Sequence, residues 1–289
     1  MLIEEMDDRG ASQKRRFSGE NALLRINTIV GFGSRAISTQ GHEQLKEYIT
    51  KTLEKAQIAV TDDEWSEENM RFNNIIGRIN PDATKRIILG THYDSIAHAY
   101  RDKTNPNAVM PGANNGASGV ALLLEAAEMI NSQYATGTLG IDLVFFDGEE
   151  GMEALGAGSK RWYPIGSTHF AENLSTLYPK DLPLQAIIFD MVCDKDLLLM
   201  KEQISMESAK SAVDRFFNIG KKIAPSEFSN SIGKAIGDDH LPLAQKGIPS
   251  FLVIDYDYEP WYNTTNDTPD KCSAESLSIV GDTLLHYLQ

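Results

Sequence analysis

Hydrophobic and polar positions along the chain follow two periods, one typical of helices and one typical of strands. Apolar residues three or four positions apart predict amphipathic helices, which cover residues 21–30, 40–56, 117–131, 207–223 and 274–288. Alternating or uninterrupted apolar runs predict strands, over residues 59–65, 74–79, 86–90, 141–146, 184–189 and 250–254. Two shorter helices are expected, one after Gly158-Ser159 and one opened by Asp238-Asp239-His240. This alternation predicts a three-layer α/β/α sandwich around a twisted, mixed and mostly parallel sheet.

The length and composition fit one globular domain. The chain has 289 residues, of which 42% are hydrophobic and 24% charged, close to the average for globular proteins. We see no internal repeat, low-complexity stretch or linker in it. We therefore expect a single domain over residues 20–289, preceded by a polar, loosely ordered leader over residues 1–19.

Net charge narrows the range of partners. The formal charge is −14 and the isoelectric point is near 4.9, which argues against nucleic acid and anionic membranes as partners. No apolar run is long enough to span a bilayer, and residues 1–19 lack the apolar core of a signal peptide. As written, the chain is expected in the cytoplasm, with a periplasmic or secreted location as the alternative if a leader has been removed.

Only two cysteines occur, Cys193 and Cys272. They are too few for a disulfide framework and lack the Cys-x-x-Cys spacing of zinc or redox sites. We expect two buried free thiols, with a single disulfide as the alternative.

The stretch from Leu143 to Gly151 combines a buried strand with two adjacent carboxylates. Its apolar residues end in Asp147-Gly148, a turn signal, and Glu149 and Glu150 follow. Neighbouring side chains on an extended segment point in opposite directions. One glutamate is therefore suited to bind a group and the other to act on it, although a solvated acidic turn is the simpler interpretation.

Other polar residues follow the ends of neighbouring predicted strands. His92 and Asp94 follow one strand and Asp190 follows another. Ligands of open α/β sheets bind at the carboxyl ends of the strands. Histidine nitrogen and carboxylate oxygen are zinc ligands, and bound zinc activates water for a nearby base. Singly these residues are read as a rim histidine and a loop cap, but together they favour a metal site.

Six ordered motifs extend this pattern over nearly the whole chain: Gly90–Ser95, Pro111–Gly119, Phe145–Gly151, Phe189–Met191, Asp239-His240 and Thr264–Thr268. In these motifs the chain resembles the zinc-dependent aminopeptidase family that also includes the glutaminyl cyclases. The resemblance covers about residues 20–288. It implies a zinc-exopeptidase-like fold and a peptide or small amino-acid-derived substrate.

The resemblance also implies roles for individual residues. In the peptidases two zinc ions share a bridging aspartate. His92 and Asp190 would bind one ion and Glu150 the other. Asp94 would orient His92 from behind, and Glu149 would be the general base that activates the bound water.

The cyclases of the family keep one zinc ion and place the equivalents of Glu149, Asp190 and Asp239 around the substrate amine. All three residues are present. Two ligand positions depart from the family: the bridging aspartate falls on Asn115, and the late histidine falls on Asn263. Neutral amide oxygens are weaker zinc ligands than carboxylate or imidazole, whereas calcium and magnesium accept them.

Three functions follow from the resemblance. The first is a metal-dependent hydrolase that removes N-terminal residues from peptides, with zinc or another divalent cation as cofactor. The second is a glutaminyl cyclase-like acyltransferase with a narrow pocket. Trp162 and Trp261 are candidates to line that pocket, although packing in the core is the simpler interpretation of each. The third is a non-catalytic homologue that binds peptide ends or partner proteins.

The dipeptide Asn115-Gly116 carries a further hypothesis. Because glycine has no side chain, its backbone nitrogen is free to attack the side-chain carbonyl of the preceding asparagine. Asn115 is therefore prone to deamidation. Deamidation to aspartate would restore the bridging carboxylate.

Overall fold

The computed structural model describes residues 16–151 and 162–289. Gly158-Ser159 and most of the predicted leader lie outside the described residues. Phe17, at the end of that leader, is buried, and its ring packs against Gly281. Ser18 accepts a hydrogen bond from the backbone N–H of Asn21 and thereby caps the first helix. The folded domain therefore includes residues that precede the predicted boundary.

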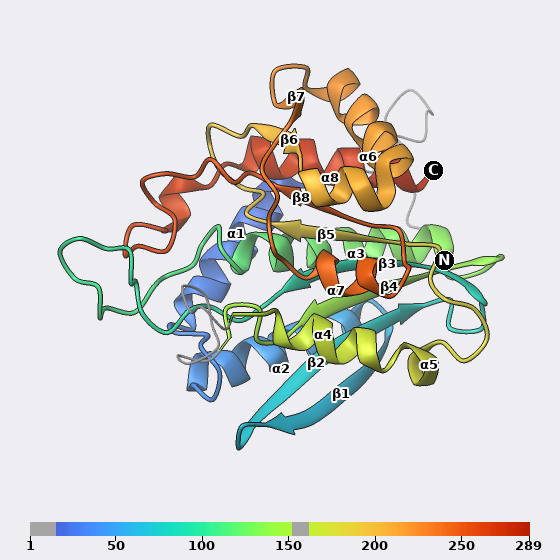
Figure 1. Cartoon of the computed structure of the whole chain (residues 1–289), viewed down its shortest axis with the longest axis horizontal. Coiled ribbons are helices and arrows are strands. Elements are labelled where there is room, and N and C mark those ends of the chain that lie inside the picture. The colour runs from blue at the N-terminus through green and yellow to red at the C-terminus, as the bar shows by residue number, and fades with distance from the viewer. Residues whose placement is uncertain (1–15, 152–161) are drawn as a thin grey trace, which may run out of the picture.

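A six-stranded sheet forms the middle layer (Figure 1), in the order β1-β2-β4-β3-β5-β8. Strands β4, β3, β5 and β8 run parallel, while β1 and β2 add an antiparallel hairpin at one edge. The strands are β1 (Ala59–Glu67), β2 (Met70–Ile79), β3 (Lys85–His92), β4 (Leu139–Phe146), β5 (Gln185–Asp190) and β8 (Ser250–Ile254).

Helices cover both faces of this sheet (Figure 1). Those on the first face are α1 (Gly19–Gly31), α2 (Gln40–Lys55), α3 (Ala117–Tyr134), α6 (Gln203–Ile223) and α8 (Ala274–Leu288). Those on the second face are α4 (Ile165–Glu172), α5 (Leu174–Leu177) and α7 (His240–Gln245). A 3-10 turn, η1 (Pro269–Lys271), precedes α8.

Alternate residues of each central strand enter different cores. Leu143 and Phe145 of β4 pack in the core of the first face, and Val144 and Phe146 in that of the second. This is the period of two expected of a strand buried on both sides. The predicted three-layer sandwich with a mostly parallel sheet is confirmed, and so are the six strands and the five long helices, with ends that shift by a few residues.

A small parallel sheet of β6 (Leu199–Lys201) and β7 (Phe228–Ile232) escaped the sequence prediction. β6 has only three residues, and β7 is Phe-Ser-Asn-Ser-Ile with three exposed positions. Neither segment carries an apolar run long enough to be distinguished from a loop.

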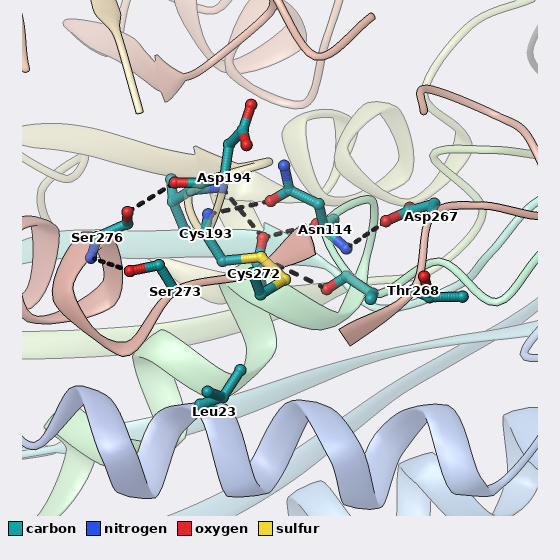
Figure 2. The surroundings of a disulfide bond; sticks show 12 residues. Leu23, Asn114, Cys193, Asp194, Asp267, Thr268, Cys272, Ser273 and Ser276 are labelled. Carbon is teal, nitrogen blue, oxygen red and sulfur yellow. Dashed lines mark hydrogen bonds between the residues drawn. A yellow bond between two sulfur atoms is a disulfide. The ribbon is translucent and has the colours of Figure 1, made fainter. Parts of the chain in front are cut away.

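The two cysteines form a disulfide bond, so the expectation of two free thiols is wrong. The Cα atoms of Cys193 and Cys272 are 4.7 Å apart, within the range that a disulfide spans. The backbone N–H of Ser273 donates to the carbonyl of Cys193, and the backbone N–H of Cys193 donates to the side chain of Asn114 (Figure 2). The disulfide therefore joins the segment after β5 to the start of α8, directly beside the loop of Asn114.

Within the described residues, no helix has both the length and the apolar character needed to cross a membrane.

Candidate active site

The first part of the site lies where β3 and β5 end side by side. Gly90 and Ile188 are paired in the parallel register, so His92 and Asp190, two residues further along, are neighbours. Nε2 of His92 is 3.1 Å from Oδ1 of Asp190, and its Nδ1 is 3.4 Å from Oδ1 of Asp94. The structure thus brings together three of the residues that the sequence predicted, and we call them the ionisable half of the site.

The carboxylate of Asp94 also fixes the turn after β4. It accepts hydrogen bonds from the backbone N–H groups of Glu149 and Glu150, both at 3.0 Å, and of Gly151 at 3.3 Å. Asp94 is fully buried, and charge-assisted bonds of this kind are strong in such surroundings. The two glutamates are therefore held by their backbone, which leaves their side chains free for other contacts.

The second part of the site joins three segments, and we call Glu150, Asn115 and Asn263 its amide half. Nδ2 of Asn115 donates to Oε1 of Glu150 and to Oδ1 of Asn263, the latter at 3.0 Å. Asn263 has a φ of +54°, a region that asparagine occupies more readily than most residues. All three predicted positions of this half are therefore linked by hydrogen bonds.

The loop that carries Asn115 has its own buried support. Asp267 accepts hydrogen bonds from the backbone N–H groups of Asn114 at 2.8 Å and Asn115 at 3.1 Å. Gly116 follows with a φ of +91°, and a Cβ atom there would lie 2.5 Å from the carbonyl oxygen of Asp94. Only glycine fits at this point, which gives the Asn-Gly pair a structural reason.

Glu149, Glu150, Asp190 and Asn115 line one cleft of about 320 Å³. The indole Nε1 of Trp162 donates to the carbonyl oxygen of Glu149 at 2.8 Å. Tyrosines, one further carboxylate and a short, mostly apolar segment form other walls; they are Tyr100, Tyr256, Tyr262, Asp238 and residues 234–237. The cleft is of the size and mixed character typical of small-molecule sites.

The structure places three further predicted residues relative to the cleft. Trp162 lines it, whereas Trp261 packs on the core of the second face beneath the ammonium group of Lys271, as the core-packing alternative expected. Asp239 is fully buried beside Asp238, which lines the cleft, and the contact of Asp239 with a substrate amine stays a prediction. These two carboxylates sit at the start of α7, whose orientation decides which one faces the cleft.

Burial and crowding shift the proton affinities of the acidic groups. Burial raises the pKa of Glu149 well above its usual range, that of Glu150 to about 8 and that of Asp238 to about 7. Burial lowers the pKa of His92, but its contacts with Asp190 and Asp94 outweigh this and raise it. Shifts of this kind concentrate at functional sites.

Several acceptor atoms at the site have no hydrogen-bond partner among residues 16–151 and 162–289. They are Oδ1 of Asn115, Oε2 of Glu150 and both carboxylate oxygens of Asp239, all buried. Unpaired buried polar atoms are costly and usually have a role. Acceptors without donors suit a ligand that brings N–H groups.

The donor set does not fit zinc. Over residues 16–151 and 162–289, no group of three or more His, Cys, Asp or Glu side chains is placed to hold a metal ion. The ionisable half offers His92 and Asp190, which contact each other directly. The amide half offers one carboxylate and two neutral amides, and the amide nitrogen of Asn115 faces Glu150. Zinc sites in proteins use three or four imidazole, thiolate or carboxylate ligands.

The three-layer sandwich and the acidic cleft at the carboxyl ends of its strands are the features expected from the resemblance to exopeptidases and glutaminyl cyclases. A model of peptidase family M28 matches residues 74–288, and the chain belongs to this family.

Individual relatives are of both kinds. The crystal structure of the Porphyromonas gingivalis glutaminyl cyclase superposes with a TM-score of 0.88 and 26% identity, over 95% of this chain and 99% of its own length. A Zn-dependent exopeptidase of Parabacteroides distasonis gives a TM-score of 0.84 and 29% identity over 94% of this chain and 98% of its own. The glutaminyl-peptide cyclotransferase of Drosophila melanogaster is 24% identical over 85% of this chain and 75% of its own.

These relatives confirm the predicted family and fold, and they identify the family as one of enzymes. They do not distinguish hydrolysis from cyclisation, since both exopeptidases and cyclases are similar to the chain. Sequence reasoning missed Asp238, Tyr100 and Tyr262 as residues of the cleft. Only the spacing of Asp238 beside Asp239 could have indicated one of them.

Proposed function

We propose that this chain acts on the free N-terminus of peptides as an acyltransferase of the glutaminyl cyclase type. Its substrate is a peptide that begins with glutamine, and its products are a cyclised N-terminus and ammonia. The names of the similar cyclases support this choice, and so does the chemistry of the cleft.

The observation that carries the proposal is the set of acidic groups and unpartnered acceptors around one cleft. Glu149, Asp190 and Asp238 line it, and the part of the chain that the structure describes supplies no donor to Oε2 of Glu150 or Oδ1 of Asn115. An N-terminal glutamine brings an ammonium group and a carboxamide, which together supply several N–H donors. Acceptors in a buried site bind such donors strongly and reject ligands that lack them.

Cyclisation needs a group that takes a proton and returns it, and Glu149 is suited to both steps. The ammonium group first releases one proton to solvent, and the neutral α-amino nitrogen then attacks the carbonyl carbon of the side-chain carboxamide, so that a new C–N bond forms. Glu149 accepts the proton that the amine loses and passes it to the departing nitrogen, so that the old C–N bond breaks and ammonia leaves. Because burial raises the pKa of Glu149, its carboxylate is a better base than an exposed one.

A second reaction uses the same residues. Aminopeptidase hydrolysis would place a water molecule beside Glu149 as the nucleophile, with the substrate ammonium group bound by the same carboxylates. The match to a peptidase family favours this alternative.

Mass spectrometry of three peptides separates the two reactions. We expect a peptide that begins with glutamine to lose ammonia and keep its length, while the same peptide beginning with leucine stays unchanged. An acetylated glutamine peptide, which has no free amine, should not react. Release of free amino acids from either peptide would instead establish the hydrolase, and no reaction with any of them would contradict both functions.

A further inference from the structure

The amide half of the site contains a hydrogen-bond chain at the place where the family resemblance implies a metal. Asn115 is the central member, because its Nδ2 donates to Glu150 on one side and to Asn263 on the other. A side-chain amide has two N–H donors, and this geometry uses both. The amide of Asn115 therefore links the three side chains that occupy the metal-ligand positions implied by the resemblance.

The hydrogen bonds of Asn115 take the place of a cation beside the buried carboxyl group of Glu150. Glu150 is 2% exposed, Asn115 3% and Asn263 0%. A carboxylate buried to this degree needs a cation or hydrogen-bond donors to offset its lost hydration. Oε1 of Glu150 receives that support from Asn115. A divalent ion on the Nδ2 side of Asn115 would face N–H groups, which repel it. The unpartnered Oε2 of Glu150 and Oδ1 of Asn115 would offer it one carboxylate and one neutral amide among the described residues, fewer than the three ligands of a catalytic zinc ion.

The ionisable half does not supply the missing ligands. His92 and Asp190 are in contact, and two ligands are fewer than the three protein ligands of a catalytic zinc ion. The opposite side of His92 faces Asp94, whose two oxygens are occupied by backbone N–H groups.

We propose that the Glu150–Asn115–Asn263 chain replaces the metal ion, so that this protein is a metal-independent member of its family. Asn115 is then a positioning residue, which holds Glu150 at the wall of the cleft and ties it to Asn263. This inference concerns what the site binds and stands apart from which reaction the cleft performs.

Two substitutions should convert the three hydrogen-bonded side chains into a metal site. Asn115→Asp removes both N–H donors and adds a carboxylate, and Asn263→His adds an imidazole. The φ of +54° at position 263 is one that histidine also tolerates better than most residues. With Glu150 these side chains make three ligands of the types that zinc prefers.

The experiment compares four proteins, each purified whole and dialysed against zinc sulfate and then against metal-free buffer. They are the natural chain, Asn263→His, Asn115→Asp with Asn263→His, and a matched control, Asn115→Asp with Asn266→His. Asn266 lies in the same loop but is exposed, so its histidine cannot reach the cleft. The readouts are bound metal by elemental analysis and the melting temperature with and without zinc.

We expect the natural chain to retain no zinc, calcium or magnesium, and its melting temperature to be the same with zinc and with a chelator. The Asn115→Asp/Asn263→His protein should retain about one zinc ion per chain and melt about 5 °C higher in zinc. The control should do neither.

Stoichiometric metal in the natural chain would overturn the proposal, and so would a double variant that binds no more zinc than its control. If the double variant does not fold, the metal content of the natural chain still decides. A natural chain without metal that also leaves glutamine peptides unchanged would contradict the proposed function alone.

Discussion

In both halves of the site a buried aspartate holds the backbone of the neighbouring loop, but the side chains that the two loops carry differ. In the ionisable half, the buried Asp94 accepts backbone N–H groups from the Glu149 turn. In the amide half, the buried Asp267 accepts those of Asn114 and Asn115. The support is therefore of the same kind on both sides, yet only the first half retains ionisable groups throughout. The frame of an active site and its chemistry are separable, and replacing two carboxylate or imidazole ligands by amides leaves the frame intact.

The largest effect should come from the residue that we hold responsible for the chemistry. Glu149→Gln keeps the shape of the side chain but removes its ability to accept a proton, so turnover should fall about 10²- to 10⁴-fold. The turn is held through its backbone N–H groups and not through this carboxylate, so the melting temperature should stay within about 2 °C. Kinetics on a glutamine peptide, beside calorimetry, measures both.

Glu64→Gln, on an exposed position of β1, is the matched control and should not change turnover. A Glu149→Gln protein with full activity would remove Glu149 from the mechanism and leave the acidic cleft without a known base.

Removing the disulfide should destabilise the amide half of the site more than the ionisable half. Cys193→Ser with Cys272→Ser removes a link between positions 79 residues apart, and we expect the free energy of unfolding to fall by about 3 kcal/mol. Because Cys193 also holds Asn114 through its backbone N–H, amide hydrogen exchange should accelerate at Asn114 and Asn115. Exchange at residues 149–151 should change less, since Asp94 supports them independently. Equal acceleration at both places would show that the halves open as one unit.

Removing each supporting carboxylate tests the shared design directly. Asp94→Asn and Asp267→Asn each leave one acceptor oxygen where the carboxylate had two, so backbone N–H groups lose a partner. We expect Asp94→Asn to cost about 3 kcal/mol and Asp267→Asn about 2 kcal/mol in urea unfolding. The difference arises because Asp94 serves three backbone donors, whereas Asp267 serves two and the hydroxyl of Tyr258, which can turn to another acceptor.

If Asp267→Asn lowered the free energy of unfolding more than Asp94→Asn does, the carboxylate of Asp267 would stabilise its half of the site more than that of Asp94. Asp282→Asn is a useful reference for both, because Asp282 accepts a single backbone N–H, that of Phe17, and should cost about 1 kcal/mol.

Much of this molecule could be predicted from its sequence, and the residues that could not share a cause. Apolar periodicity is a local property, so the strand of Leu143–Phe146 and the helix at 117–131 were found within a few residues. Motif spacing placed His92, Asp94, Glu150 and Asp190 at one edge of the sheet, because parallel strands end together.

The misses depend on contacts between distant segments. The pairing of Cys193 with Cys272 requires the end of β5 to meet the start of α8, and no local pattern encodes that meeting. That Asp238 also lines the cleft depends on how a six-residue helix is turned.

The smallest expected effect is the slow deamidation of Asn115, which would give the amide half a second carboxylate. The reaction requires the backbone nitrogen of Gly116 to attack the side chain of Asn115, and both parts are held: the backbone N–H of Asn115 by Asp267 and its amide by Glu150 and Asn263. We therefore expect only a few per cent of the folded chain to deamidate at position 115 over weeks. The cysteine double variant should deamidate faster, because the disulfide supports this loop. Peptide mass analysis of aged samples measures both, with the exposed Asn230-Ser231 pair as an internal reference. Equal rates in the two proteins would show that the loop is held by its hydrogen bonds alone, and the amide half would then be as independent of the disulfide as the ionisable half.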